Sequence, residues 1–363
     1  MRVILAGGGT TGHISPMLAT AQELTAIKDN VDIVCVGTPK GLETTLVPDA
    51  GFELVTIDPV PLPRRITWAL VTMPLRLMKA INQARKILRR RGADVVVGFG
   101  GYACLPVYIA ARWLKIPVVV HEANAVPGLA NRIGARFASR VCVTFPSTAL
   151  PNHQVTGMPM SKKISQLDRH LGRVSARKQW GLDPQDFVLL VSGGSQGAMS
   201  LNKALWGASR QLCDQGVSIL HITGKANVGL VPPSMPEGYQ ALAYVSSMDQ
   251  AYAAADLMVG RAGAATVCET ATVGLPTIFV PLPHGNGEQE KNAHDLVEAG
   301  GGIIVKDCEL TSETMVELVT NLMNDPQGLT AMSQAGRAVV PRDSAQLLAQ
   351  QVISVVEEGQ TWH

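Results

Sequence analysis

Short apolar runs alternate along the chain with longer segments that have the periodicity of helices. These runs are rich in Val, Ile and Leu and span residues 3–7, 31–37, 93–101, 116–122, 187–194, 218–224, 255–263 and 275–283. Strands as apolar as these, separated by helices, are typical of a parallel sheet with helices on both faces. The pattern predicts an α/β fold of the doubly wound type.

The two halves of the chain repeat one order of elements. Residues 93–101 ("ADVVVGFGG") and 255–263 ("ADLMVGRAG") each lead through a helical segment to another apolar strand. Residues 4–12 and 190–198 are each an apolar strand that opens into a glycine-rich turn. We expect two similar domains that meet in the Pro- and Gly-containing segment 145–163, although α/β units in general share such features. Ligands of such domains bind at the carboxyl ends of the strands.

The first glycine-rich turn, "GGGTTGHIS", raises the question of dinucleotide binding. Gly7, Gly9 and Gly12 satisfy the GxGxxG pattern, but an NAD site also needs an acidic residue at the end of the second strand. That strand, "VDIVCVGT", ends without one. An NAD-dependent oxidoreductase is therefore the weaker alternative.

His13 follows this turn at the start of a predicted helix. The free amides and the positive dipole end of a helix attract negative charge and favour the neutral form of a nearby imidazole. A neutral imidazole accepts a proton near pH 7, which makes His13 a candidate general base. The alternative is that His13 only caps the helix.

The second half holds further candidate ligands of a nucleotide sugar. The turn "GGSQGAMSLN" offers the Ser195 hydroxyl and backbone amides to a pyrophosphate, and Asn202 could brace that turn. Residues 264–266 open another helix, and Glu269 is placed to accept hydrogen bonds from ribose hydroxyls. Gln289 could contact sugar hydroxyls through its amide. Ordinary turn and capping chemistry is the alternative for each.

Composition narrows the classes of partner. Lys and Arg total 31 against 29 Asp and Glu, so no overall charge favours nucleic acid. The six Cys have no metal-ligand spacing, and the DxD triplet of metal-dependent sugar transferases is missing. Neither a secretion signal nor an apolar stretch long enough to span a bilayer occurs. We expect a cytoplasmic protein, soluble or peripheral to the membrane, that requires no cofactor or metal.

The segment 64–91 combines positive charge with apolar faces, and no acidic residue lies between Pro59 and Gly92. Its basic residues are Arg64, Arg65, Arg76, Lys79, Arg85, Lys86, Arg89, Arg90 and Arg91. One apolar stripe consists of Ile66, Leu70, Met73, Leu77, Ile81, Ala84 and Leu88, and a second of Trp68, Val71, Leu75 and Met78. One stripe can pack on the core, and the other would suit an anionic membrane surface. A buried connector helix is the alternative, and Pro74 favours two shorter helices.

Together these motifs resemble the family of peptidoglycan N-acetylglucosaminyltransferases that convert lipid I to lipid II. The sequences "GGGTTGHISPMLA", "GFGGYACLPVYIAA", "PVVVHEANAVPGLANR", "GGSQGAMSLN", "GRAGAATVCE" and "NGEQEKNA" occur in the family's order and at about its spacing. The resemblance implies a GT-B glycosyltransferase with two Rossmann-like domains, 1–160 and 161–340, and a C-terminal helix within 341–363 that returns to the first. It also implies that the second domain holds most of UDP-GlcNAc.

The resemblance further implies roles for individual residues. His13 and Glu122 are the two candidates for the catalytic base, and Tyr102, His121 and Asn131 would line the acceptor side. The donor would contact Thr10, Thr11, Gly12, Asn124, Ser161, Ser195, Val245, Ala264, Ala265, Thr266, Val267, Cys268, Glu269 and Gln289. Within this set, the Val245 backbone would read the uracil edge.

Three positions depart from the family pattern. Thr11 stands where Gly is frequent, so the loop must accommodate a Cβ atom. Ser161 stands in place of an Arg that helps to bind the nucleotide, and Lys162 or Lys163 could replace that Arg. Glu288 replaces the first of two Gln residues, which leaves its sugar contact open.

The expected reaction is a single displacement with inversion, in which the C4 hydroxyl of N-acetylmuramic acid in lipid I attacks C1 of GlcNAc and UDP leaves. The expected partners are UDP-GlcNAc, lipid I, the anionic inner leaflet and cell-wall synthesis complexes, at the cytoplasmic face of the membrane. One alternative is another GT-B transferase that acts on a diacylglycerol or polyprenol lipid. A non-catalytic UDP-sugar-binding subunit is the other, and the presence of both halves in one chain disfavours it.

Overall fold

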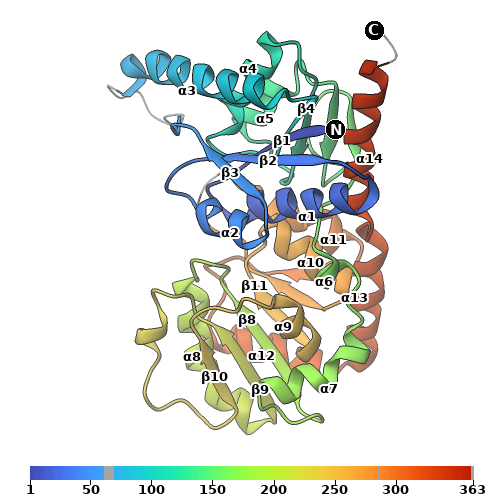
Figure 1. Ribbon diagram of the computed structural model, residues 1–363. Helices are drawn as coiled ribbons and strands as arrows, with labels where there is room; N and C mark the ends of the chain where they lie inside the picture. Colours follow the sequence, from blue (N-terminus) through green and yellow to red (C-terminus); the bar gives the residue numbers. More distant parts are fainter. Residues whose placement is uncertain (61–68, 285, 361–363) are drawn as a thin grey trace. The chain divides into compact units, whose positions relative to one another are not determined.

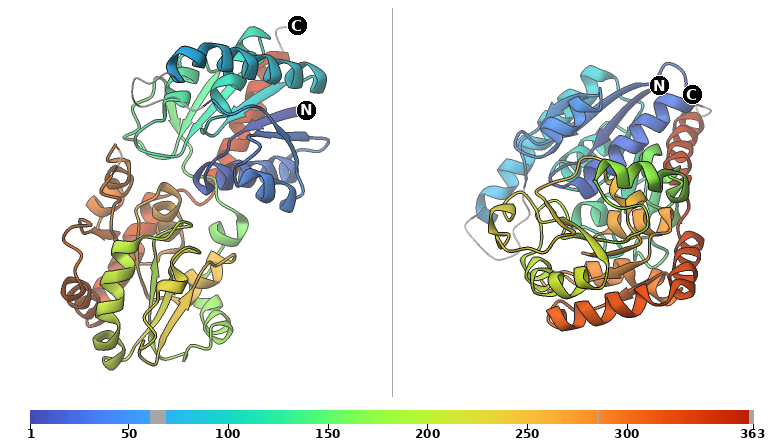
Figure 2. Two further views of the ribbon diagram at one scale, coloured as in Figure 1. Left: turned by 90° about the vertical axis from the view of Figure 1, so that its left-hand side faces the viewer. Right: turned by 90° about the horizontal axis from the view of Figure 1, so that it is seen from below.

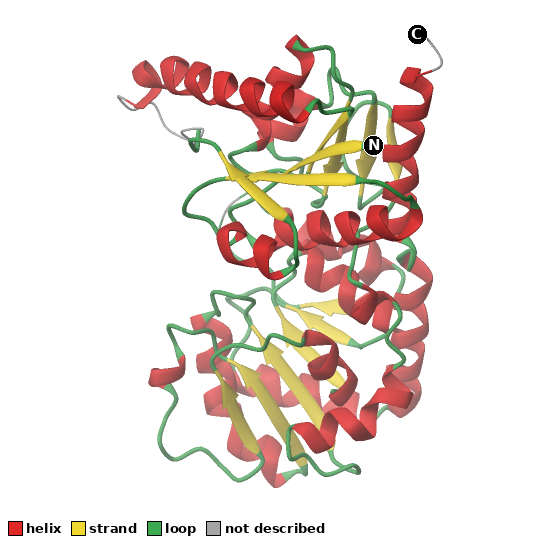
Figure 3. Cartoon of the chain, in the orientation of Figure 1, coloured by secondary structure: helices red, strands yellow, loops and turns green. Residues whose placement is uncertain are grey.

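A computed structural model describes residues 1–60, 69–284 and 286–360 (Figure 1). The chain forms two compact units, one of residues 1–161 with 343–363 and one of residues 162–342. Each unit contains a parallel sheet between layers of helices (Figure 3). The prediction of two doubly wound α/β domains is therefore confirmed.

The first unit is built on a parallel sheet with the strand order β3-β2-β1-β4-β5-β6-β7. Its strands are β1 (Arg2–Ala6), β2 (Asp32–Gly37), β3 (Glu53–Thr56), β4 (Val95–Gly98), β5 (Val118–Glu122), β6 (Arg140–Val143) and β7 (His153–Val155). Its helices are α1 (Thr11–Ile27), α2 (Glu43–Asp49), α3 (Ala69–Arg91), α4 (Cys104–Trp113), α5 (Leu129–Gly134) and α14 (Ser344–Gln360). The strand order reverses between β1 and β4, so the loops that follow these two strands separate there, at the usual ligand position of such sheets.

The apolar runs are continuous because this sheet has a core on each face. In β1, Val3 and Leu5 face a core that α1 and α14 complete, whereas Ile4 and Ala6 face a core formed with α3 and α4. Since successive side chains of a strand point to opposite faces, both faces must be apolar.

The C-terminal helix α14 belongs to the first unit. It packs along α1, and its residues Leu348 and Val352 are completely buried in the core of that unit. Lys28 at the end of α1 forms an ion pair with Glu357 at 2.6 Å, and Arg140 pairs with Glu358. The chain thus leaves the first unit after Ser161 and completes it only with its last helix.

One continuous helix, α3, spans Ala69–Arg91, so the expectation of two shorter helices at Pro74 is wrong. Pro74 lies inside the described helix and removes one backbone N–H, but α3 continues through it. Within the predicted stripes, Ile81 and Leu88 are buried in the core, whereas Leu75 and Met78 are 77% and 47% exposed. Residues 61–68, with Arg64, Arg65, Ile66 and Trp68, and the side chains of residues 69–72 lie outside the described part of the chain.

The second unit is built on a parallel sheet with the strand order β10-β9-β8-β11-β12-β13. Its strands are β8 (Phe187–Ser192), β9 (Val217–Ile222), β10 (Tyr239–Leu242), β11 (Leu257–Gly260), β12 (Thr277–Phe279) and β13 (Gly302–Ile304). Its helices are α6 (Lys162–Ser165), α7 (Arg169–Gln179), α8 (Met199–Asp214), the 3-10 turn η1 (Val228–Leu230), α9 (Met248–Ala254), α10 (Ala264–Val273), α11 (Glu288–Glu298), α12 (Ser312–Met323) and α13 (Pro326–Val339).

The repeat seen in the sequence corresponds to equivalent positions in the two sheets. β1 and β8 each lie at the centre of a sheet and lead into a glycine-rich turn, and β4 and β11 pair beside them. Helices α8 and α12 cover one face of the second sheet, whereas α7 and α9 pack together on the other (Figure 2). The candidate residues therefore follow the carboxyl ends of equivalent strands in the two units.

Candidate active site

The first glycine-rich turn places His13 in the first turn of α1. His13 Nδ1 lies 3.1 Å from the carbonyl oxygen of Gly8 and 3.4 Å from Thr10 Oγ1. A carbonyl oxygen only accepts, so in the neutral imidazole Nδ1 carries the proton and Nε2 has the free lone pair. The local geometry thus gives His13 the tautomer that a base acting through Nε2 requires.

The loop after β4 comes close to the same imidazole. A Cβ atom placed on Gly100 would lie 2.9 Å from His13 Nε2, and Gly100 has a φ of +100°. Only glycine fits this position without strain. Thr11 causes no comparable conflict, because it is the first residue of α1 and has an ordinary helical backbone.

Glu122, the rival candidate base, is 2% exposed and fully hydrogen-bonded. Its Oε1 accepts from the backbone N–H of Asn124 at 2.9 Å. Its Oε2 accepts from the N–H of Gly128 and from Asn131 Nδ2, both also at 2.9 Å. This carboxylate fixes the loop between β5 and α5, an arrangement that favours His13 as the base.

The residues expected on the acceptor side lie at different depths. Tyr102, in the turn between β4 and α4, is exposed. His121 and Asn131 are buried, and their expected place on the acceptor side stays a prediction. His121 Nε2 lies 3.0 Å from the Gly157 carbonyl, and burial lowers the pKa of His121 to about 4. Asn131 accepts from Tyr108 and donates to Glu122, so it supports the β5 loop.

In the second unit, Ser195 is exposed in the turn between β8 and α8. Asn202 of α8 is buried and donates to the Thr223 carbonyl at 3.1 Å, which links this turn to the loop after β9. His221 Nε2 lies 3.0 Å from Asn202 Oδ1, and its Nδ1 lies 2.6 Å from the Tyr239 hydroxyl. Asn202 therefore braces the turn, as the sequence suggested.

Glu269 lies on α10, whose start at Ala264 follows the end of β11. The Tyr252 hydroxyl of α9 donates to Glu269 Oε2 at 2.8 Å. Burial raises the pKa of Glu269 to about 7, although the bond from Tyr252 opposes that rise. The remaining residues of the expected donor set on this helix, Ala265, Thr266, Val267 and Cys268, occupy its first turns.

The other donor candidates lie in loops of the two units. Val245 is buried after β10, and Asn124 is half-buried after β5. Gln289 accepts through Oε1 from the N–H of Leu282 at 2.9 Å, and Glu288 begins α11 beside it. Ser161, Lys162 and Lys163 are exposed where the two units join in sequence.

Sequence reasoning missed Arg261, which is buried at the end of β11. Its guanidinium donates to the carbonyls of Val280 and Pro281, both at 3.1 Å, and forms an ion pair with Asp307. It also donates to Ser200 Oγ at 2.8 Å. Arg261 thereby ties together segments that follow β8, β11, β12 and β13. A single Arg at the end of a run as apolar as "ADLMVG" was the available signal.

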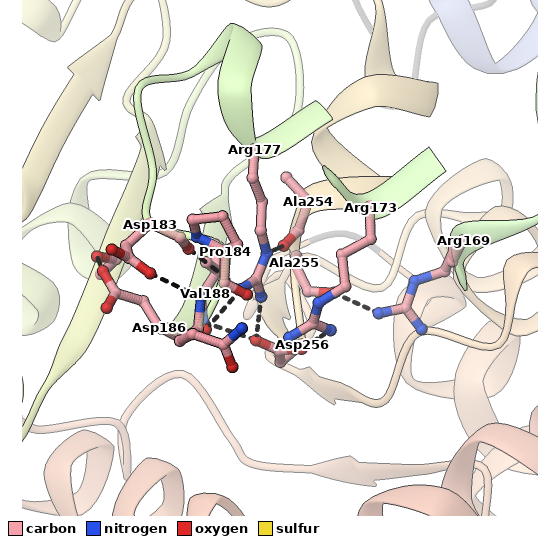
Figure 4. A network of polar contacts seen from close by, with 12 residues as sticks. Arg169, Arg173, Arg177, Asp183, Pro184, Asp186, Val188, Ala254, Ala255 and Asp256 are labelled. Carbon is pink, nitrogen blue, oxygen red and sulfur yellow. Dashed lines mark hydrogen bonds and ion pairs between the residues drawn. The ribbon is translucent and has the colours of Figure 1, made fainter. Parts of the chain in front are cut away.

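A second charged cluster lies at the amino ends of the strands of this sheet, whereas Arg261 lies at the carboxyl end of β11 (Figure 4). Arg177 of α7 is completely buried, and its Nη2 lies 2.6 Å from Asp256 Oδ2. Asp256 also accepts from the N–H of Val188 at 2.8 Å and pairs with Arg173. Because Val188 and Asp256 lie at the amino ends of β8 and β11, this cluster fastens α7 to the sheet and is separate from the candidate donor residues.

Neither a metal-binding cluster nor a membrane-spanning helix occurs in the described ranges. Across residues 1–60, 69–284 and 286–360, His, Cys, Asp and Glu side chains form no group of three suited to hold a metal ion. The same ranges contain no helix with the length and hydropathy needed to cross a bilayer.

Comparison with known proteins identifies the family. The glycosyltransferase family 28 N-terminal domain matches residues 3–143, and the C-terminal domain of that family matches residues 188–351. A UDP-N-acetylglucosamine–N-acetylmuramyl-(pentapeptide) pyrophosphoryl-undecaprenol N-acetylglucosamine transferase from a Nocardioides species is 51% identical, over 98% of each chain. The enzyme of the same name from Mycolicibacterium vanbaalenii is 48% identical, over 98% of this chain and 90% of its own.

Solved structures agree with these relatives. The crystal structure of Acinetobacter baumannii MurG superposes with a TM-score of 0.78 at 32% identity, over 97% of this chain and 99% of its own. The calicheamicin glycosyltransferase CalG4 superposes with a TM-score of 0.70 at 17% identity, over 98% of each chain, which supports the GT-B fold alone. The chain belongs to glycosyltransferase family 28 and, within it, to the family of UDP-N-acetylglucosamine–N-acetylmuramyl-(pentapeptide) pyrophosphoryl-undecaprenol N-acetylglucosamine transferases.

Proposed function

We propose that the protein transfers GlcNAc from UDP-GlcNAc to the C4 hydroxyl of N-acetylmuramic acid in lipid I, with inversion, and so forms lipid II. The observation that carries the proposal is the near-complete coverage, at about half identity, of relatives named for this transfer. The turns that hold His13 and Ser195 and the helix that holds Glu269 supply local support.

The chemistry needs a base, a donor pocket and stabilisation of the leaving UDP. His13 presents an unprotonated Nε2 when its Nδ1 donates to Gly8, so it can take the proton of the attacking hydroxyl. Glu269 accepts hydrogen bonds from the ribose, and the start of α10 faces the phosphates with its free amides. Neither a metal nor another cofactor has a step in this scheme.

The test is transfer of labelled GlcNAc from UDP-GlcNAc to a short-chain lipid I analogue, with a diacylglycerol as the competing acceptor. We expect product from the analogue alone. Transfer to the diacylglycerol would instead identify another GT-B transferase. Binding of UDP-GlcNAc without transfer to either acceptor would identify a non-catalytic subunit.

We further propose that the protein acts at the cytoplasmic face of the membrane, bound peripherally through the exposed side of α3. Leu75 and Met78 project from a helix that also carries Arg76, Arg89 and Arg90, all exposed. Apolar side chains flanked by cations suit an anionic leaflet, where each basic residue near the surface contributes about 1 kcal/mol. Such a location suits a lipid-linked acceptor and a role in peptidoglycan synthesis during cell growth and division, with cell-wall synthesis complexes as partners.

The double variant Leu75→Glu with Met78→Glu tests this attachment by sedimentation with vesicles that contain anionic lipid. We expect its vesicle binding to fall at least about tenfold, because two apolar contacts are lost and two negative charges gained. The matched control is Leu171→Glu, which changes a leucine of the second unit that is 84% exposed. Equal loss in the control, or unchanged binding in the double variant, would contradict attachment through α3.

A further inference from the structure

A buried carboxylate fills the space behind the first glycine-rich turn. Glu43, the first residue of α2, is completely buried. Its Oε2 accepts from the N–H of Gly9 at 2.9 Å. Its Oε1 accepts from the N–H of Thr38 at 2.8 Å and from Thr38 Oγ1 at 2.7 Å. Burial opposes ionisation, but these hydrogen bonds lower the pKa of Glu43, so the group is a carboxylate at neutral pH.

Three glycines, one after β1, one at the end of β2 and one between β2 and α2, make room for this one side chain. A Cβ atom on Gly8 would lie 2.3 Å from Glu43 Oε1, and one on Gly41 would lie 1.9 Å from Oε2. On Gly37, at the end of β2, it would lie 2.6 Å from Glu43 Cγ. Two of these contacts are with the carboxylate itself, so the glycines and Glu43 form one packed unit.

The Glu43 carboxylate accepts from a backbone N–H of the glycine-rich turn, a group that in a dinucleotide site donates to the ligand. In such sites the amides of the glycine-rich turn and an acid at the end of the second strand face the nucleotide. Here the Gly9 and Thr38 amides both point to Glu43. The acidic residue here belongs to α2, and it binds the amide of the glycine-rich turn that a nucleotide would otherwise bind.

The Gly8–Gly9 peptide connects Glu43 with His13, because its N–H binds Glu43 and its carbonyl binds His13. Gly9 has a φ of +88°, a conformation that only glycine adopts easily, and Glu43 holds its N–H. The peptide that ends in this N–H begins with the Gly8 carbonyl, which accepts from His13 Nδ1. Rotation of that peptide would turn the carbonyl away from the imidazole.

We infer that Glu43 is a positioning residue for His13: it fixes the Gly8–Gly9 peptide, which holds Nδ1 protonated and leaves Nε2 free. The inference rests on the proposed function, in which His13 Nε2 takes the proton of the acceptor hydroxyl. Glu43 itself touches no reacting atom in this arrangement.

The variant Glu43→Gln tests the inference with almost no change of side-chain volume. A carboxamide has one accepting oxygen and one donating nitrogen, so it cannot accept from both the Gly9 and the Thr38 amides. The matched control is Asp49→Asn, the same change of group on an exposed residue of the same helix. If Glu43→Gln does not fold, Thr38→Val replaces it, because it removes the hydrogen bond from Thr38 Oγ1 to Glu43. The same measurements and the same expected changes then apply to Thr38→Val.

Two measurements distinguish a role of Glu43 in positioning His13 from a role only in stabilising the fold. The first is the tautomer of His13, read from imidazole ¹⁵N shifts in protein labelled with [¹⁵N]histidine, and the second is steady-state transfer. In the Glu43 variant we expect both tautomers of His13, a kcat at least about tenfold lower and a KM for UDP-GlcNAc within about threefold of the unmodified protein. The Asp49 control should leave all three unchanged.

An unchanged His13 tautomer in the Glu43 variant would overturn the inference, whether or not kcat falls, because a loss of kcat alone would mean a structural role. Failure of the proposed function is recognisable separately. If the unmodified protein transfers no GlcNAc to lipid I, the proposed function fails, while the tautomer measurement still decides whether Glu43 controls His13.

Discussion

Glu269 gives the proposed donor site a pH dependence. Burial raises the pKa of this carboxyl to about 7, and the Tyr252 hydroxyl, 2.8 Å from Oε2, opposes that rise. Hydroxyl groups form stronger hydrogen bonds to a carboxylate than to a carboxylic acid. We therefore expect the ribose of UDP-GlcNAc to bind mainly to the ionised form of Glu269.

The magnitude follows from the fraction of Glu269 that is ionised. With a pKa of about 7, this fraction is about 9% at pH 6 and about 91% at pH 8. The apparent Kd for UDP-GlcNAc should therefore be about tenfold lower at pH 8 than at pH 6. Isothermal titration calorimetry measures this Kd directly, and the diphosphate of the ligand has no group that titrates in this range.

The same shift acts on stability in the opposite direction. The pKa of Glu269 is about 7 in the folded protein against a usual 4.5, so between these values the folded protein binds more protons than the unfolded chain. The contribution to the free energy of unfolding is fully present below pH 4.5 and is lost as the pH rises through 7. It amounts to at most about 3 kcal/mol, because part of the side chain reaches solvent.

The variant Glu269→Gln decides whether this carboxyl is responsible. It should bind UDP-GlcNAc more weakly than the unmodified protein at pH 8, with a Kd that is the same at pH 6 and pH 8. Tyr252→Phe should move the transition in Kd to higher pH, because it removes the hydrogen bond that lowers the pKa of Glu269. Equal Kd values for the unmodified protein at both pH values, or a pH dependence that survives in Glu269→Gln, would refute the reasoning.

Two predictions concern single residues of the two units. His13→Ala should lower kcat by about 10²-fold or more in steady-state kinetics, with little change in donor Kd. Glu122→Gln should mainly lower the melting temperature in thermal unfolding. Full turnover by His13→Ala would reverse the assignment of the base. Asp256→Asn should cost about 3–5 kcal/mol in urea unfolding, because it leaves the buried Arg177 without its charge partner. The surface control Asp295→Asn should cost less than about 1 kcal/mol, and a similar cost for both would contradict the role of the buried pair.

The sequence predicted the central strands of both sheets well, because burial on two faces makes them apolar without interruption. β4, β8 and β11 lie within predicted runs, and β1 differs from its run by one residue at each end. The edge strands β3, β7, β10 and β13 were not predicted, and neither was β6, which lies between β5 and β7 in the first sheet. β7 has only three residues and one of them is Val155, which is 45% exposed, so its pairing with β6 rather than its composition makes it a strand.

The candidate site was predictable where chemistry depends on a local motif and not where it depends on distant packing. Ser195 lies in the turn after β8, and His13 and Glu269 lie in the first two turns of the helices that follow β1 and β11. Their places past the carboxyl ends of these strands could therefore be expected. The segment "TPKGLETTLVP" contains nothing that separates Glu43 from a solvated helix residue, because Gly8 and Gly37 come from other strands. The burial of His121 was hidden in the same way, since a polar residue in the run "IPVVVHE" is equally compatible with a surface position.

The return of α14 to the first unit determines the order in which a ribosome can complete the two units. The second unit, residues 162–342, is a continuous stretch of chain that can fold as soon as it has been synthesised. The first unit keeps an uncovered apolar face on α1 until Leu348 and Val352 emerge from the exit tunnel. The half synthesised first is therefore the half finished last, and premature termination anywhere before residue 344 exposes the core of the unit that holds His13.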